Sequence, residues 1–363
     1  MKSPSFRVRL NPWSQLPVHS ELRASNGHNC LSVASDRSKL CKLTTEGRSN
    51  NMDERAGVLV TGGAGFIGSH LVDKLISSGY CLTIIDNLSM GKLGNVEGHL
   101  RDGRVRFVKG DIRDVELVRS CVQDVDVVVH LAAVISVPFS FENPSLTLDI
   151  NVNGTLNLLD ACSRAGVKRF VFVSSCAVYG DPRYLPVDER HPTSPLSPYA
   201  TSKLDGEEGC VNHLEQYGLS IVILRLFNVY GPRQGLNAYG GVITRFLDQA
   251  RKHTPLVIFG DGSQTRDFVH VWDVAEAILK ALETTSAEGE VFNIGFGRAT
   301  SVNTLAKSVI DLTGADIGVI YEKARIGDVR SSFADISKAE KQLNFKPSVP
   351  LGEGLQSLVE EAC

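Results

Sequence analysis

The sequence predicts an α/β fold in which a doubly wound parallel sheet is followed by a smaller C-terminal α/β lobe. Two observations indicate the sheet. Short Val- and Ile-rich runs alternate with segments of helical periodicity, and a glycine-rich turn joins the first run to the first helix. Continuous apolar strands are typical of a parallel sheet that is buried on both faces. From about Asn228 the elements shorten and Gly and Pro interrupt them, which predicts the smaller lobe.

The elements of the sheet follow one another in order along the chain. The first helix has apolar residues at helical spacing, and Gly79 is expected to end it. The remaining segments repeat this alternation up to residue 226. The expected strands are 58–60, 81–85, 105–108, 126–130, 170–173 and 220–226, and the expected helices are 66–78, 115–122, 146–165 and 199–217.

The composition is that of an ordinary globular protein, with 363 residues, 42% hydrophobic and 22% charged. No run approaches the ~18 apolar residues that a membrane helix needs. A net charge of −3 gives no electrostatic reason to expect nucleic acid or an anionic membrane as a partner. The eight cysteines are scattered without CxxC spacing, so we expect reduced thiols in a cytoplasmic protein and no metal site.

The charge is unevenly divided along the chain. Residues 1–51 hold eight Lys and Arg against three Asp and Glu, a formal +5, which leaves 30 against 38, a formal −8, for residues 52–363. The first segment also has nine Ser and no sustained periodicity. Three interpretations stay open: an organelle-targeting peptide, a disordered regulatory tail, or a protein whose translation begins at Met52.

A glycine loop follows the first strand and opens the first helix. Gly62 allows a tight turn, Gly65 lets a pyrophosphate approach the backbone, and Gly68 lets helix and strand pack closely. The helix N-terminus offers free N–H groups to the phosphates. Asp86 ends the second strand 18 residues after Gly68, where it can accept from ribose hydroxyls and favours NAD over NADP. The pattern predicts a Rossmann-type dinucleotide site, and Asp111 ends the third strand, where its carboxylate can meet adenine.

A second group of polar residues lies further along the chain. Ser175 ends a strand, and Tyr199 follows 24 residues later with Lys203 one helical turn beyond it. A phenol with a pKa of ~10 is a poor base at neutral pH, whereas a nearby ammonium and a nicotinamide cation favour the phenolate. Such a group can deprotonate an alcohol while hydride passes to NAD. The three residues therefore predict redox chemistry at a carbinol carbon.

Together these motifs resemble the extended short-chain dehydrogenases/reductases. Within that superfamily the chain is similar to the NAD-dependent epimerase/dehydratase family, and most to the UDP-glucose 4-epimerases among its nucleotide-sugar epimerases. The resemblance covers nearly all of the chain after Met52. Besides the glycine loop and the Ser175, Tyr199 and Lys203 set, it rests on the segments 86–88 (Asp-Asn-Leu), 130–133 (His-Leu-Ala-Ala), 151–155 (Asn-Val-Asn-Gly-Thr), 225–233 (Arg-Leu-Phe-Asn-Val-Tyr-Gly-Pro-Arg) and 266–271 (Arg-Asp-Phe-Val-His-Val).

The resemblance implies two sets of binding residues. We expect residues 1–51 to be a disordered or non-native extension, 52–227 to form mainly the NAD domain, and 228–363 to form mainly the nucleotide-sugar lobe, interleaved with it. His130 is expected to be a packed structural residue. NAD is expected to contact Gly62, Gly65, Phe66, Ile67, Gly68, Asp86, Asn87, Asp111, Ile112, Leu131, Ala132, Ala133, Asn151, Tyr199 and Lys203. The sugar nucleotide is expected to contact Ser136, Ser175, Asn228, Val242, Phe259, Arg266, Arg325, Asp328 and Ser332.

The implied activity is inversion at C4 of a UDP-hexose through a 4-keto intermediate, in a cytoplasmic homodimer. Related 4,6-dehydratases carry an Asp-Glu pair after the first triad residue, and Cys176-Ala177 here cannot do that proton chemistry. Ser332 occupies the position that is small in enzymes accepting N-acetylated sugars, with Ser331 beside it. UDP-glucuronate epimerisation or decarboxylation, another sugar-nucleotide epimerase, and a non-catalytic NAD-sensing protein remain as alternatives.

Overall fold

Seven strands, all pairing in parallel, form the larger sheet in the order β10–β6–β5–β4–β1–β2–β3. The computed structural model describes residues 57–235, 241–324 and 329–360. The strand order reverses at β1, because the chain adds β2 and β3 on one side and β4, β5 and β6 on the other. The strands are β1 (Gly57–Thr61), β2 (Cys81–Asp86), β3 (Val105–Lys109), β4 (Val127–His130), β5 (Arg169–Ser175), β6 (Ile221–Leu226) and β10 (Val291–Ile294).

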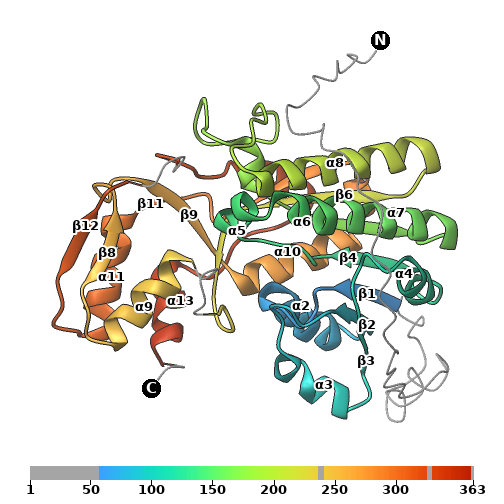
Figure 1. Ribbon diagram of the computed structural model, residues 1–363, viewed down its shortest axis with the longest axis horizontal. Helices are drawn as coiled ribbons and strands as arrows, with labels where there is room; N and C mark the ends of the chain where they lie inside the picture. Colours follow the sequence, from blue (N-terminus) through green and yellow to red (C-terminus); the bar gives the residue numbers. More distant parts are fainter. Residues whose placement is uncertain (1–56, 236–240, 325–328, 361–363) are drawn as a thin grey trace. The chain divides into compact units, whose positions relative to one another are not determined.

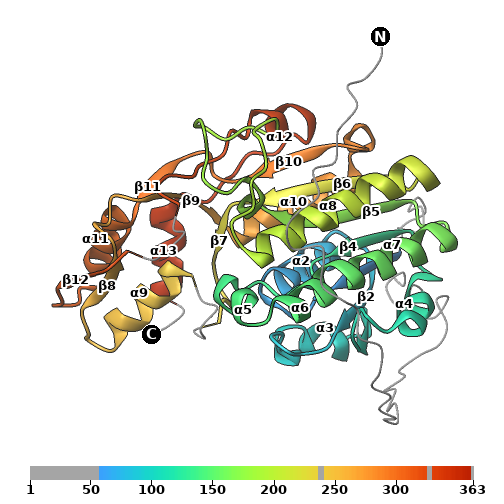
Figure 2. The ribbon, with the colours of Figure 1, turned by 45° about the horizontal axis from the view of Figure 1, so that its top comes forward.

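Helices cover both faces of this sheet (Figures 1 and 2). Successive side chains of a strand point to opposite faces, so Val58 and Val60 pack in the core under α2 and α10, while Leu59 packs under α4, α7 and α8. All three residues are fully buried. The covering helices are α2 (Phe66–Ser77) and α10 (Val271–Glu283) on one face, and α4 (Val115–Val122), α7 (Gly154–Ala165) and α8 (Pro198–Tyr217) on the other.

Shorter elements fill the connections between the strands and helices of the larger sheet. Ser136 caps α5, where its hydroxyl accepts a hydrogen bond from the backbone N–H of Phe139. Helix α12 contacts β10. These elements are η1 (Leu93–Asn95), α3 (Glu97–Arg101), α5 (Val137–Glu142), α6 (Pro144–Leu148), η2 (Asp149–Asn153), η3 (Cys176–Tyr179), η4 (Thr285–Ala287) and α12 (Ser337–Gln342).

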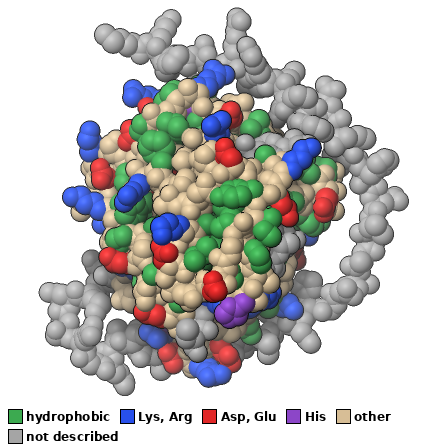
Figure 3. Space-filling view, turned by 90° about the vertical axis from the view of Figure 1, so that its left-hand side faces the viewer, with side chains coloured by type: hydrophobic (Ala, Val, Ile, Leu, Met, Phe, Trp, Pro, Cys, Tyr) green, Lys and Arg blue, Asp and Glu red, His purple; other side chains and the backbone are tan. Residues whose placement is uncertain are grey.

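The smaller sheets lie in the second half of the chain. β11 (Ala299–Ser301), β9 (Thr265–His270) and β7 (Asn228–Tyr230) form one sheet, and β12 (Val319–Glu322) pairs in parallel with β8 (Leu256–Phe259). Phe246, Leu305 and Leu355 form the core between α9 (Val242–Arg251), α11 (Val302–Thr313) and α13 (Leu351–Glu360). Figure 3 shows the surface on this side, where acidic and basic side chains are mixed among small hydrophobic groups.

The parallel α/β fold predicted from the sequence is confirmed, with two differences in its elements. The segment 146–165 is not one helix, because a π-helical turn, Asp149–Asn153, separates α6 from α7. Strand β10 and helix α10 come from the second half of the chain and yet belong to the larger sheet and its cover. No helix in the described ranges is long and apolar enough to cross a membrane.

Close packing of α8 on β5 depends on Gly206. A Cβ there would lie 2.6 Å from Cζ of Phe172, a residue that is only 1% exposed. We therefore expect Gly206→Ala to lower the free energy of unfolding by about 1–3 kcal/mol through overpacking. Gly352→Ala is the matched control, because that helical glycine faces open space and alanine should be neutral or slightly stabilising. Denaturant titration measures both, and equal stabilities of the two variants would contradict this packing argument.

Candidate active site

The carboxyl ends of β1, β4 and β5 meet at one edge of the larger sheet. Thr61 of β1 is in register with His130 of β4, and His130 with Phe172 of β5. This edge includes the point where the strand order reverses, which is where open α/β sheets bind ligands. The glycine loop follows β1, and Ser175 ends β5, so the two sequence motifs come to the same edge.

The glycine loop is packed too closely to admit side chains at two of its positions. A Cβ on Gly62 would lie 2.9 Å from the backbone nitrogen of Ala132, and one on Gly68 would lie 2.1 Å from the carbonyl oxygen of Gly62. Gly62 also has a φ of 72°, a left-handed conformation that favours glycine. Helix α2 begins after Gly65 with no side-chain cap and no acid in its first turn. The half-buried N-terminal turn with Phe66 and Ile67 is thus suited to an anion.

Asp86 links the end of β2 to the glycine loop. Its carboxylate accepts hydrogen bonds from the backbone nitrogens of Ala64 (3.0 Å) and Leu88 (2.8 Å). Burial raises the pKa of this carboxyl group, and the two backbone hydrogen bonds oppose that shift. Gly91 packs closely, since a Cβ there would lie 2.9 Å from one carboxylate oxygen. Leu88 is held at φ 60°, a conformation uncommon for leucine that the sequence did not reveal.

A surface ion-pair cluster surrounds Asp111 near the ends of β2 and β3. The guanidinium of Arg113 donates to both carboxylate oxygens of Asp111 at 2.9 Å and to Asp149 at 2.9 Å. Asn87 donates to Asp111 as well, at 3.2 Å. The hydrogen bonds from Arg113 hold the pKa of Asp111 below its usual value. The adenine contact of Asp111 stays a prediction, whereas its bidentate pairing with Arg113, two residues later, was missed.

His130 is a fully satisfied structural histidine, as expected. Its Nε2 lies 2.9 Å from Oγ1 of Thr155 and its Nδ1 lies 2.7 Å from Oγ1 of Thr61. The single hydroxyl hydrogen of Thr155 goes to the carbonyl of Asn151, so Nε2 must donate and Nδ1 accepts from Thr61. Burial lowers the pKa of His130 to about 3, which keeps the ring neutral. Thr61 in turn accepts from the backbone nitrogen of Ala132 and orients the loop after β4.

Asn151 connects three parts of the site from within the π-helical turn. Its side-chain nitrogen donates to the carbonyl of Val134 and to Oγ of Ser202, both at 2.9 Å, and its oxygen accepts from the nitrogen of Val134 at 2.7 Å. Both amide hydrogens are therefore used within the protein. Ser202 donates to the carbonyl of Tyr199, so Asn151 also supports the helix turn that carries Tyr199. Its direct contact with NAD stays a prediction.

The structure brings Ser175, Tyr199 and Lys203 together. The Ser175 hydroxyl hydrogen-bonds the phenol of Tyr199 and also accepts from the backbone nitrogen of Ala177 at 3.2 Å. Lys203, only 6% exposed, donates from Nζ to the carbonyl of Val173 at 3.0 Å. Ser197 caps the N-terminus of α8 and sets where Tyr199 enters the helix.

Burial disfavours the charged forms of both Tyr199 and Lys203. It raises the pKa of Tyr199 to about 12, and the hydrogen bond from Ser175 offsets this only in part. It lowers the pKa of Lys203 to about 8, although the carboxylate of Glu207 raises it. The ammonium is directed at the Val173 carbonyl, and its expected lowering of the Tyr199 pKa is not seen in this arrangement. A further positive charge beside Tyr199 is needed to favour the phenolate at neutral pH.

The residues expected to bind the sugar nucleotide lie on the C-terminal elements. Asn228 on β7 donates to the carbonyl of Asp267, and Arg266 on β9 acts electrostatically on the thiol of Cys176, directly after Ser175. The backbone nitrogen of Ser332 donates to the carbonyl of Thr265, which places Ser332 beside β9. The remaining predicted residues are Ser136 and Val242 at helix N-termini and Phe259 under the guanidinium of Arg245, while Arg325 and Asp328 lie outside the described residues.

Other predicted cofactor residues line the same edge. The half-buried residues of the loop after β4 follow His130 directly. The buried Ile112 packs against Gly154, because a Cβ on Gly154 would lie 2.5 Å from Cδ1 of Ile112. Within the described ranges, no three His, Cys, Asp or Glu side chains are grouped so that they could hold a metal ion. The loop residues are Leu131, Ala132 and Ala133.

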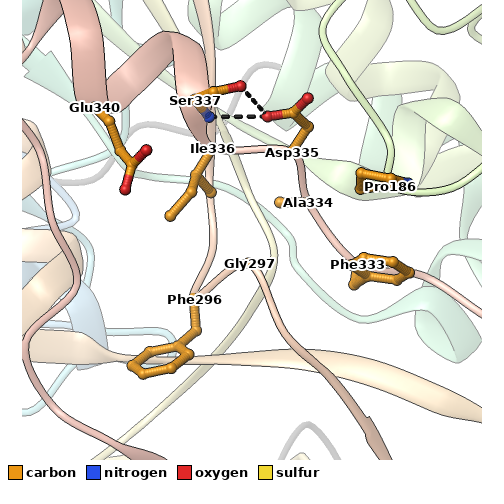
Figure 4. A pocket seen from close by; sticks show the side chains of 9 residues that line it. All are labelled: Pro186, Phe296, Gly297, Phe333, Ala334, Asp335, Ile336, Ser337 and Glu340. Atoms are coloured by element: carbon orange, nitrogen blue, oxygen red, sulfur yellow. Dashed lines mark hydrogen bonds between the residues drawn. The ribbon is translucent and has the colours of Figure 1, made fainter.

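A hollow of about 370 Å³ lies on the C-terminal side, next to Ser332 in the sequence. Figure 4 shows Asp335 in it, hydrogen-bonded to the backbone nitrogen and hydroxyl of Ser337. None of its lining residues belongs to the glycine loop or to the Ser175, Tyr199 and Lys203 set. We therefore do not assign the reaction to it. Its lining residues are Pro186, Phe296, Gly297, Phe333, Ala334, Asp335, Ile336, Ser337 and Glu340.

The fold and the site define a dinucleotide-binding protein of the short-chain dehydrogenase/reductase type. The residues present fit NAD: the glycine loop packs closely at Gly62 and Gly68, the first turn of α2 is uncapped, and Asp86 ends β2. The family model of the NAD dependent epimerase/dehydratase family matches residues 58–295. The chain belongs to this family.

Several known proteins that are similar to this chain bear names of sugar-nucleotide epimerases, and others are named as UDP-glucuronic acid decarboxylases. A putative UDP-glucose 4-epimerase of Methanocaldococcus jannaschii is 47% identical over 304 residues, which are 83% of this chain and 97% of that protein. The crystal structure of UDP-glucose 4-epimerase from Thermotoga maritima with UDP-glucose is 40% identical and matches with a TM-score of 0.80 over 84% of this chain and 97% of that one. A UDP-N-acetylglucosamine 4-epimerase from Methanobrevibacter ruminantium, in complex with UDP-N-acetylmuramic acid, is 39% identical with the same TM-score and coverages.

We expect Asp86→Asn to weaken NAD binding by at least about tenfold, since the substitution removes a charged acceptor for the ribose hydroxyls and disturbs the loop at Ala64. Isothermal titration of NAD into the cofactor-free protein measures the affinity. Asp102→Asn is the matched control, because Asp102 is an exposed acid paired with Arg104 at the surface, and its loss should leave the affinity unchanged. Equal NAD affinities of parent protein and Asp86→Asn would contradict the assigned role.

Proposed function

We propose that the protein is an NAD-dependent 4-epimerase of UDP-hexoses, with UDP-glucose and UDP-galactose as substrates and UDP-GlcNAc and UDP-GalNAc as further candidates. The observation that carries this proposal is the hydrogen-bonded Ser175 and Tyr199 with Lys203 at the sheet edge that bears the glycine loop. Cys176-Ala177 follow Ser175 and supply no acid-base pair, which argues against 4,6-dehydration. The names of the similar proteins support the same activity.

The proposed division of labour follows from the contacts at the site. Tyr199 takes the proton from the C4 hydroxyl and later returns it, and Ser175, already hydrogen-bonded to that phenol, orients the substrate oxygen. Lys203, whose ammonium donates to the Val173 carbonyl, is proposed to hold the nicotinamide ribose, and the nicotinamide cation would be the further positive charge that favours the phenolate of Tyr199. NAD held by the glycine loop and Asp86 would supply the hydride acceptor and donor for C4, so that hydride could return to the other face of the 4-keto sugar. The cofactor is regenerated in each turnover.

The substrate lobe is proposed to hold the diphosphate firmly while the sugar turns. Arg266 lies close enough to Cys176 to influence its thiol, so it can meet a phosphate near Ser175. Asn228 and Phe259 remain the proposed contacts for the diphosphate and the uracil, and Arg325 and Asp328 are proposed from the sequence alone. Ser332 beside β9 leaves space for an acetamido group.

Uronate substrates are a second candidate, because one basic residue favours them. Arg330 is exposed, and its carbonyl accepts from the backbone nitrogen of Thr265, next to Arg266. A guanidinium there could pair with a sugar carboxylate. Binding of NAD without catalysis is less well supported, since the proteins that have lost activity on this fold typically lose the Tyr or the Lys, and both are present.

We also propose a cytoplasmic homodimer. Helices α5, α6 and α7 pack against α8, and all four expose large apolar side chains. A second copy of the chain could bury them. The scattered spacing of the cysteines supports a reducing compartment. The exposed apolar residues are Val137, Phe141, Leu146, Leu156, Val211 and Tyr217.

Incubation with UDP-glucose, UDP-GlcNAc, UDP-glucuronate and dTDP-glucose, with products resolved by NMR, tests the proposed substrate. We expect C4 inversion of UDP-glucose, and of UDP-GlcNAc as well because Ser332 is small. Ser332→Tyr should then reduce turnover of UDP-GlcNAc more than that of UDP-glucose, and Ser331→Tyr shows whether the neighbouring serine sets the size instead. Conversion of UDP-glucuronate alone would favour the uronate enzyme, and conversion of no sugar would favour the binding protein.

Removal of the Tyr199 hydroxyl tests the proposed mechanism. Tyr199→Phe should lower kcat for C4 inversion by at least about a hundredfold, because the proton has no acceptor, while UDP affinity changes little. Tyr217→Phe on the same helix is the control, since Tyr217 is 61% exposed and its loss should leave kcat intact. Near-normal epimerisation by Tyr199→Phe would end the mechanism.

A further inference from the structure

A buried ion pair lies one helical turn beyond Lys203. Glu207 on α8 is 4% exposed and Arg225 on β6 is 7% exposed. The guanidinium donates from Nη2 to Oε2 of Glu207 at 2.6 Å and from Nε to Oε1 at 3.0 Å. Ser174 donates to Oε1 of the same carboxylate at 2.5 Å. The carboxylate thus joins α8, β5 and β6 at one point.

This carboxylate is connected to the catalytic residues on both sides. Ser174 is the residue before Ser175, and the carbonyl of Val173, the residue before that, accepts from Lys203. The end of β5 is therefore fastened to α8 twice, once through the ammonium of Lys203 and once through Glu207. A shift of either attachment would move Ser175 relative to the helix that carries Tyr199.

The carboxylate of Glu207 also acts electrostatically on Lys203. Lys203 is buried, and an isolated buried ammonium readily loses its proton. The charged or titratable groups that act on it are Glu207 and Cys210 from its own helix and the neutral His130 from β4. Glu207 is the anion of this set, because the Cys210 thiol has its pKa raised by burial. Arg225 keeps that carboxylate in place and itself lies 4.8 Å from the ring centre of Tyr179.

We propose that Glu207 is a positioning residue of the reaction: held by Arg225 and Ser174, its carboxylate keeps Lys203 charged and fixes the end of β5 against α8. The assignment rests on the proposed epimerase function for its kinetic consequence only. No proton or hydride passes through Glu207, and it needs no contact with substrate or cofactor. Without its negative charge, Lys203 becomes neutral at a lower pH.

Glu207→Gln tests the charge with little change of shape. The ε-carbon resonance of Lys203 in protein labelled with ¹³C-lysine, identified by its absence in Lys203→Met, reports the titration of the amine directly. We expect its midpoint to fall by about one pH unit or more, the effect of losing a nearby opposite charge. Glu208→Gln is the matched control, because Glu208 is the adjacent, exposed acid and should leave the midpoint where it is.

The kinetic test uses the pH profile of kcat for C4 inversion. The alkaline limb, where Lys203 loses its proton, should move to lower pH in Glu207→Gln, with at least a tenfold loss of kcat above the new midpoint and KM within about threefold. Ser174→Ala removes a hydrogen bond but no charge, so it should leave that limb in place. A uniform loss of kcat at all pH values, with an unmoved limb, would overturn the charge role.

Breaking one half of a buried ion pair can prevent folding, so a second variant removes both charges. Glu207→Gln combined with Arg225→Met leaves no uncompensated charge. Because Arg225→Met also removes a positive charge, the downward shift of the Lys203 midpoint should be smaller in this double variant than in Glu207→Gln, and an upward shift overturns the proposal. The resonance measurement needs no turnover: if the parent protein converts no sugar, the proposed function fails while the role of Glu207 toward Lys203 is still decided.

Discussion

Several polar groups at the carboxyl edge of the larger sheet are buried, and each of these needs a partner inside the protein. An unpartnered buried donor or acceptor costs about 1–3 kcal/mol, so a site built here must be a closed network. The side chains of Thr61, His130 and Thr155 form such a network, since each of their hydroxyl and ring N–H hydrogens has one assigned acceptor. It fixes the loop after β4 without any charge, and that loop lies against the glycine turn at Gly62.

The same constraint decides where charge is tolerated. Burial raises the pKa of Tyr199 and lowers that of Lys203, so it acts against the ionised pair that the chemistry needs. Coulomb attraction in a low-dielectric interior is strong enough to compensate, but only at short range. The carboxylate of Glu207, one turn from Lys203, offsets part of the effect of burial on the amine, and the bidentate bond from Arg225 prevents it from turning away. The positive charge beside Tyr199 therefore depends on residues that touch no ligand.

Sequence reasoning succeeded where a feature is local. The glycine spacing, the acid at the end of β2 and the i, i+4 pair of Tyr199 and Lys203 are each set by one turn or one strand end, and all lie at the predicted edge. It failed where distant segments meet. Asn151 in the π-helical turn reaches across to Val134 and Ser202, and no periodicity in the sequence encodes that contact. The assigned binding roles themselves remain predictions.

The second half of the chain completes the site through one buried acid. Asp267, fully buried on β9, accepts from the backbone nitrogens of Phe296, Gly297 and Ala334, and its own carbonyl accepts from Asn228. One carboxylate thus fastens the segment after β10 and the segment containing Ser332 to the strand that carries Arg266. Arg266 also acts electrostatically on the thiol of Cys176, so this strand lies near the end of β5 that carries Ser175. The proposed sugar contact at Ser332 and the proposed phosphate contact at Arg266 therefore depend on one carboxylate, and a change at Asp267 would move both together.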